Sequence, residues 1–119
     1  MASIEARGLR KTFGTTIALD GVDLCVEEGR ILGLIGPNGA GKTTALNAML
    51  GLTPYEGSLN VLGRDPWSER ELLMRDVCFI ADVAVLPRWI RVSQVLDYVA
   101  GVHPRFDRAK AEGFLARTN

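Results

Sequence analysis

Apolar and polar residues alternate in two stretches near the start of the chain, residues 3–9 and 17–26. A period of two is typical of strands that bury one face, so both stretches are predicted β-strands. Between them, residues 11–14 (Lys-Thr-Phe-Gly) predict a hairpin turn. Gly21 predicts a bulge or turn inside the second strand, and residues 27–30 predict an exposed turn after it.

Two further stretches are apolar without alternation, Ile31–Ile35 and Val77–Ile80. Runs of this kind are typical of strands that are buried on both faces, as in parallel sheets. Residues 57–63 lie between two glycines and predict one more short strand.

Helices are predicted at 45–50, from 66 to about 75, from 92 until Gly101 and Pro104 end the helix, and from 106 or 107 to about 117. The first is followed by Gly51, the residue type that most often ends a helix. Asp65 is suited to cap the second, with a proline at its first helical position. The third has apolar residues at the i, i+3, i+4, i+7 spacing of one helix face.

The segment before the first helix reads Gly36-Pro37-Asn38-Gly39-Ala40-Gly41-Lys42-Thr43-Thr44. It matches G-x-x-x-x-G-K-[ST], with the preceding strand and following helix that this phosphate-binding motif requires. The glycines let backbone N–H groups converge on a polyphosphate, and the helix N-terminus adds partial positive charge. Lys42 can then reach the outer phosphates, and the Thr43 hydroxyl can bind Mg²⁺. The alternative is a glycine-rich turn that precedes a helix without binding phosphate.

Composition narrows the class of protein. The 119 residues include 14 Lys+Arg and 14 Asp+Glu, so the formal net charge is +0 and no nucleic-acid partner is expected. Cys25 and Cys78 have no neighbouring ligand residues and are predicted to be buried free thiols. No signal peptide or membrane-spanning run is apparent, which predicts a soluble, cytoplasmic chain.

Together, the motif GPNGAGKTT, the turn KTFG and the strand TIALDGVDL resemble the ATP-binding subunit of an ABC transporter. The resemblance extends over the whole chain and implies an α/β fold. That fold is a P-loop NTPase-like sheet with an N-terminal antiparallel β portion and flanking helices, here incomplete. It divides the chain into an antiparallel part (1–30), a phosphate-loop core (31–81), and a segment that begins the helical subdomain (82–119).

The resemblance also assigns roles to residues. Phe13 corresponds to the aromatic residue that stacks on adenine, although packing at the sheet edge is an alternative. Thr43 corresponds to the Mg²⁺ ligand and Thr44 to a contact with an inner phosphate. The full phosphate-binding set carried over is Gly36, Asn38, Gly39, Ala40, Gly41, Lys42, Thr43 and Thr44.

One position departs from the family pattern. The strand Val77–Ile80 should lead to a Gln or Glu that touches Mg²⁺, and this sequence has Asp82 there. Aspartate is also a hard oxygen donor, so it can serve as a metal ligand; a solvated or capping role is an equal alternative. Shortly after it, Trp89 suits either an interface with a transmembrane partner or local packing.

The sequence contains neither the family's signature loop nor an apolar strand ending in Asp-Glu, and His103 is not placed as the switch histidine. We therefore expect the N-terminal portion of an ATP-binding domain, which binds ATP and Mg²⁺ without hydrolysing ATP and has no catalytic residue of its own. In the complete family, the domain pairs with a second ATP-binding subunit and a transmembrane subunit at the inner face of the membrane. Alternatives are a non-catalytic interaction fragment and another phosphate-loop enzyme such as a small-molecule kinase.

Overall fold

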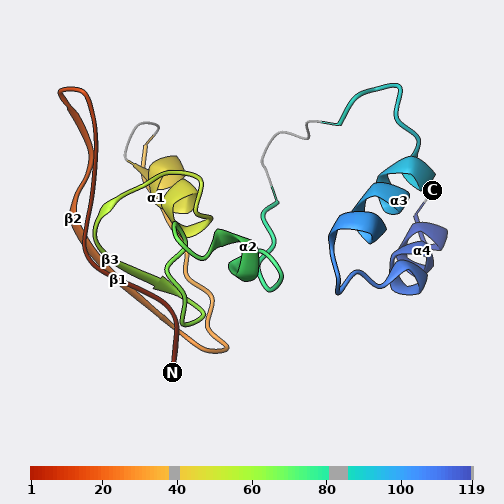
Figure 1. The fold of residues 1–119 in the computed structure, drawn as a ribbon, viewed down its shortest axis with the longest axis horizontal. Coiled ribbons are helices and arrows are strands. Elements are labelled where there is room, and N and C mark those ends of the chain that lie inside the picture. The colour runs from red at the N-terminus through yellow and green to blue at the C-terminus, as the bar shows by residue number, and fades with distance from the viewer. Residues whose placement is uncertain (38–40, 81–85, 119) are drawn as a thin grey trace. The chain divides into compact units, whose positions relative to one another are not determined.

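The computed structural model describes residues 1–37, 41–80 and 86–118. The chain forms two compact units, Met1–Cys78 and Phe79–Asn119. Within the described ranges, the first unit has three strands and two helices, and the second has two helices (Figure 1).

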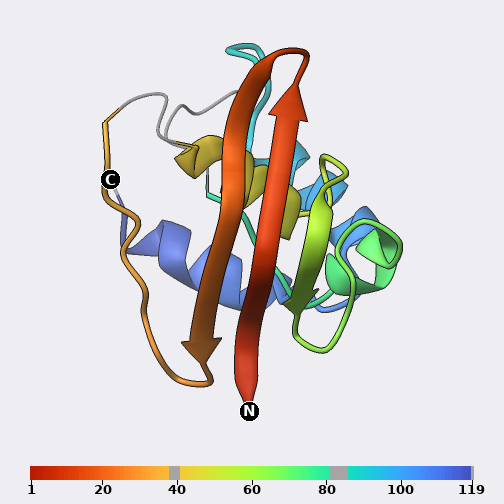
Figure 2. The same cartoon turned by 90° about the vertical axis from the view of Figure 1, so that its left-hand side faces the viewer.

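The sheet of the first unit is built on a long hairpin of β1 (Ala2–Phe13) and β2 (Thr16–Glu27). The other edge of β1 pairs with β3 (Glu56–Val61), so the order is β2-β1-β3 and both pairings are antiparallel (Figure 2). The turn of the hairpin is tighter than the sequence predicts, because β1 continues through Phe13 and Gly14 turns with φ 59°. The antiparallel N-terminal portion is thus confirmed.

Two glycine bulges decide which residues of the hairpin face the core. β2 has one extra residue at Gly21, as predicted, and β1 has one extra residue between Ala6 and Leu9. The second bulge centres on Gly8, whose φ of 59° favours glycine and whose N–H donates to Asp23 Oδ1 at 2.7 Å. It moves the inward-facing positions of β1 from even to odd numbers, so that Ala6 and Leu9 are both 1% exposed.

The first helix, α1 (Lys42–Met49), packs on one face of this sheet (Figure 2). It ends as predicted at Gly51, which has φ 71° and donates its N–H to the Ala48 carbonyl at 3.0 Å. A short helix, α2 (Arg70–Leu73), contributes Leu73 to the same core. The buried core consists of Ala6, Leu9, Leu19, Ala45, Ala48, Met49, Leu59, Val61 and Leu73.

Several predictions for the first unit were wrong. The predicted helix 66–75 is a turn followed by the four residues of α2, because Glu69 has φ −115° and ψ 27°, outside the helical region. The predicted strands Ile31–Ile35 and Val77–Ile80 are not strands: among the described residues no strand pairs with either, and Ile31 is 100% exposed. A strand without a hydrogen-bonding neighbour gains nothing from extended geometry.

The cysteines were also predicted wrongly, since both thiols are free but exposed. Cys25 lies between the half-buried Leu24 and Val26 of β2, on the outward side of the alternation. Its Sγ donates to Glu27 Oε1 at 3.5 Å. Desolvation by neighbouring atoms and this carboxylate together raise the pKa of the Cys25 thiol.

The second unit contains α3 (Val92–Val102) and α4 (Arg108–Ala116), close to the predicted ranges. Asp107 caps α4 by accepting the Lys110 N–H at 2.9 Å. Arg108 links the two helices through an ion pair with Asp97 and also pairs with Glu112 at 3.1 Å. In the part of the chain that the structure describes, neither helix nor any other is long and apolar enough to cross a membrane.

Candidate nucleotide-binding site

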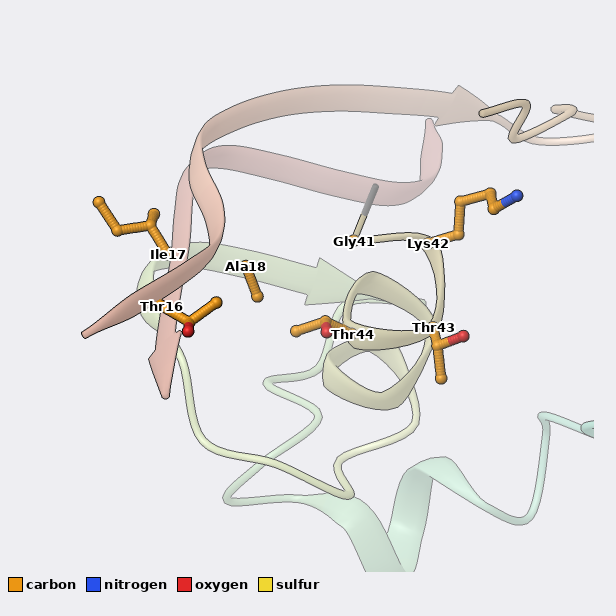
Figure 3. Close-up of a pocket in the computed structure, with 7 residues that line it drawn as sticks. All are labelled: Thr16, Ile17, Ala18, Gly41, Lys42, Thr43 and Thr44. Carbon is orange, nitrogen blue, oxygen red and sulfur yellow. The ribbon is translucent and has the colours of Figure 1, made fainter. Parts of the chain in front are cut away.

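A pocket of about 430 Å³ lies between the start of α1 and β2 (Figure 3). In the phosphate-loop motif, residues 41–44 turn into the helix and form one wall. The other wall comes from the strand that follows the hairpin turn. The lining residues are Thr16, Ile17, Ala18, Gly41, Lys42, Thr43 and Thr44.

Gly41 sets the distance between these two walls. Its φ is 93°, in the left-handed region that favours glycine. A Cβ built on Gly41 would lie 2.5 Å from the Ala18 carbonyl oxygen and 3.1 Å from Leu19 Cδ2. The loop backbone therefore lies directly against β2, at a separation that no side chain at position 41 allows.

The N-terminus of α1 offers backbone donors to this pocket. Its N-cap is Gly41, which has no side chain to cap the helix, and no acidic residue lies in the first turn. The first intrahelical bond joins the Ala45 N–H to the Gly41 carbonyl at 2.9 Å. The N–H groups of residues 42–44 have no acceptor within the helix and carry the partial positive charge of its end, which suits an anion.

Lys42 supplies the formal charge of the site. Its Nζ donates to the Gly36 carbonyl, which connects the first glycine of the motif to its lysine. An ammonium has three N–H donors, so two remain for other acceptors. In Figure 3 the Thr44 side chain extends toward Ala18 of β2, whereas Lys42 and Thr43 extend away from that strand. The hydroxyl of Thr43 is in an exposed residue and accessible to a ligand.

Phe13 lies beside the pocket rather than among its lining residues. It pairs with Thr16 across the hairpin. Because directly opposed residues of an antiparallel pair have neighbouring side chains, Phe13 is adjacent to the Thr16 end of the pocket. Phe13 as a residue is 53% exposed, and the Lys11 ammonium lies 5.1 Å from the centroid of its ring. A flat, accessible ring at this position can stack on a base.

Similarity to known proteins identifies the family of this chain. The family model described as ABC transporter matches residues 19–117. The chain belongs to the ABC transporter family. Within it, the chain corresponds to the N-terminal part of the ATP-binding domain.

Three curated relatives illustrate the similarity. The hemin import ATP-binding protein HmuV of Thermobifida fusca is 44% identical over 103 residues, which cover 84% of this chain and 34% of that protein. The sulfate/thiosulfate import ATP-binding protein CysA of Bradyrhizobium diazoefficiens is 38% identical over 118 residues, or 97% of this chain and 33% of that protein. The Nod factor export ATP-binding protein I of Cupriavidus pinatubonensis is 50% identical over 70 residues, or 58% and 21%. The chain thus spans about a third or less of these relatives' lengths.

Solved structures give the same result for the fold. The ATP-binding subunit of an ABC transporter superposes with a TM-score of 0.77 at 25% identity, over 87% of this chain and 44% of that one. The ADP conformation of an ATP-binding cassette of an ABC transporter has a TM-score of 0.52 at 36% identity, over 55% and 26%. The incomplete P-loop NTPase-like α/β fold that the sequence predicts is confirmed.

The predicted site residues of this ABC family member are partly brought together. Gly41, Lys42, Thr43 and Thr44 line the pocket, Gly36 is bound by Lys42, and Phe13 borders it. Within the described residues, no group of three or more His, Cys, Asp or Glu side chains could hold a metal ion. The remaining predicted residues, Asn38, Gly39, Ala40 and the metal candidate Asp82, lie outside the described residues.

The wall formed by Thr16, Ile17 and Ala18 was not predicted from the sequence. These residues carry no motif, and their alternation indicates only a strand. The only indication in the sequence was indirect. Residues 16–18 come directly after the tight turn that follows Phe13, so a base that contacts Phe13 would also lie beside the strand that contains them. His103 is the half-buried C-cap residue of α3, and its Nδ1 accepts the Arg105 N–H at 3.3 Å.

Proposed function

We propose that this chain binds ATP with Mg²⁺ in the pocket between α1 and β2, as the nucleotide-binding part of an ABC transporter. The observation that carries the proposal is the Gly41 geometry. It holds the uncapped start of α1, with Lys42, against β2 at a separation closed to any side chain. A pocket of about 430 Å³ remains, lined by backbone donors, hydroxyls and one cation.

The residues fit the parts of the nucleotide. The N–H groups of the first turn and Lys42 would hold the outer phosphates, and Thr44 an inner phosphate. The Thr43 hydroxyl, aided by Asp82, would hold Mg²⁺, which neutralises and orients the phosphates when bound. Phe13 would stack on the base at the far end, adjacent to Thr16.

Binding and turnover are separate properties of this site. The seven residues that line the described pocket carry one cation and no carboxylate. Phosphoryl transfer also needs a group that positions the attacking water. We therefore propose that the chain holds ATP without appreciable hydrolysis. In the assembled transporter it would work with a second ATP-binding subunit and a transmembrane subunit, at the inner face of the membrane.

The test is calorimetric titration of the 119-residue chain with ATP and Mg²⁺, compared with Lys42→Ala. Removing a charged hydrogen-bond donor from the phosphates should weaken binding by about tenfold or more. Lys110→Ala removes the same charge from α4 and should leave the dissociation constant unchanged. Equal affinity of wild type and Lys42→Ala would refute the proposed site.

Hydrolysis is measured separately, as phosphate release over time. We expect the wild-type rate to equal that of Lys42→Ala. Steady release by the wild type that disappears in Lys42→Ala would show that the chain is an active ATPase. The family assignment favours this function over that of a small-molecule kinase. We therefore expect no phosphoryl transfer from ATP to adenosine or to sugar acceptors.

A further inference from the structure

Lys11 is not among the described residues that line the candidate nucleotide pocket, yet its side chain lies over the ring of Phe13, which borders that pocket. Its ammonium is 5.1 Å from the centroid of Phe13, within the range of a cation–π interaction. The two residues are two positions apart in β1, so their side chains leave the same face of the strand. Lys11 is half-buried, which limits the positions its chain can take.

The other neighbours of Lys11 include residues at the start of β3. It lines a second pocket, of about 310 Å³, together with Pro54, Tyr55 and Glu56 at the start of β3. The candidate nucleotide pocket is instead lined by β2. Because β2 and β3 flank β1 on opposite edges, the pocket beside Lys11 lies toward the β3 edge and the candidate nucleotide pocket toward the β2 edge.

We propose that Lys11 is a positioning residue for the adenine end of the site. Its ammonium covers one face of Phe13 and holds the ring so that the opposite face meets the base. A cation on one face also draws π-electron density away from the other, which favours stacking of an electron-rich purine. The inference deepens the proposed function and rests on it.

The experiment compares two ligands, ATP and inorganic triphosphate, each with Mg²⁺, in calorimetric titrations of the full chain. Lys11→Met keeps the length of the side chain and removes its charge. It should raise the dissociation constant for ATP about two- to fivefold and leave that for triphosphate unchanged, because only the nucleoside contacts Phe13. Lys11→Arg, which keeps a cation over the ring, should restore ATP affinity.

Arg10→Met is the matched control, because Arg10 is the neighbouring cation on the same second pocket and pairs with Asp20 at 3.6 Å instead of the ring. It should change neither affinity. Equal losses for both ligands, an equal effect of Arg10→Met, or tighter ATP binding by Lys11→Met would overturn the proposal. The last result would mean that Lys11 occupies the face that the base needs.

A second measurement tests the contact without ligand. The Lys11 ε-protons should be shifted upfield by the Phe13 ring current in NMR spectra, and Phe13→Leu should remove the shift. Absence of the shift in the wild type overturns the positioning role alone. If the wild type binds neither ATP nor triphosphate, the proposed function fails, and the nucleotide role of Lys11 fails with it.

Discussion

The most demanding test of the site is the substitution Gly41→Ala. It adds one methyl group where the phosphate-binding loop meets β2. Two penalties arise, because φ is 93° at this position and the new Cβ would lie 2.5 Å from the Ala18 carbonyl oxygen. Real Cβ contacts essentially never fall below 3.0 Å, so the loop and the strand must move apart.

The two penalties can be estimated separately. A left-handed conformation costs an alanine about 1–2 kcal/mol. Forcing an extra methyl group into a closed contact costs about 1–3 kcal/mol. The sum, about 2–5 kcal/mol, is a large part of the roughly 5–15 kcal/mol that stabilises a typical domain. Only the second penalty changes the pocket, because relief of the steric contact moves the start of α1 away from β2.

Gly63→Ala is the matched control for the first penalty. Gly63 also has positive φ, 80°, but a Cβ there meets nothing within 4 Å among the described residues. Urea unfolding followed by circular dichroism should show a loss of about 1–2 kcal/mol for Gly63→Ala. Gly41→Ala should lose about 1–3 kcal/mol more, and it alone should weaken ATP binding.

The reasoning would be refuted if the two variants lost the same free energy of unfolding and bound ATP equally well. That result would mean that Gly41 does not approach Ala18 closely, and that the pocket wall is not set by this contact. A loss of ATP affinity without any extra loss of stability would place the effect in the ligand contacts of the loop instead.

Other predictions concern groups outside the pocket. The pKa of the Cys25 thiol is raised by desolvation and by the Glu27 carboxylate; Glu27→Gln should speed its alkylation by iodoacetamide near pH 9, and an unchanged rate would contradict the contact. Because the pKa of Cys25 is raised in the folded chain, the contribution of its protonated thiol to stability is present below pH 9 and declines as pH rises further. Tyr55 donates to Asp65, whose pKa is lowered mainly by that bond, so the carboxylate's contribution to stability is present above its usual pKa and is lost as pH falls below it. Tyr55→Phe should cost about 1 kcal/mol and flatten acid unfolding below pH 4; an unchanged acid transition would count against the bond. Gly101 lies inside α3, and a Cβ there meets no described residue within 4 Å. Gly101→Ala should therefore raise helix stability by about 0.5–1 kcal/mol, which thermal unfolding at 222 nm can measure; lower stability would show that a contact opposes the methyl group.

Sequence patterns correctly predicted the features that depend only on residues close to one another in the chain. Alternation located β1 and β2, flanking glycines located β3, and the glycine after Leu50 ended α1 where the sequence indicated. The bulge at Gly21 was also predicted. The bulge at Gly8 was not, because its signature lies in cross-strand pairing rather than in the strand's own residues. It reverses the face on which β1 buries its side chains.

Apolar character alone did not place Ile31–Ile35. A continuous apolar run indicates burial on two faces, but a strand forms only where a neighbouring strand supplies hydrogen bonds, and the described residues supply none there. The prediction for Cys25 failed for a similar reason, because apolar neighbours in sequence do not fix the direction of a single side chain. Its apolar surroundings in sequence suggested a buried thiol, whereas the pleat of β2 turns it outward.

The sequence by itself determined the chemistry of this protein. Glycines, a lysine and two threonines at fixed spacing match the pattern of a phosphate-binding loop, because the backbone angles and charges that such a loop requires are properties of those residues alone. Tertiary structure decided what stands opposite that loop. The wall at Thr16–Ala18 and the contact that makes Gly41 indispensable both join residues that are distant in sequence. Such contacts depend on strand register and strand order, which no local pattern encodes.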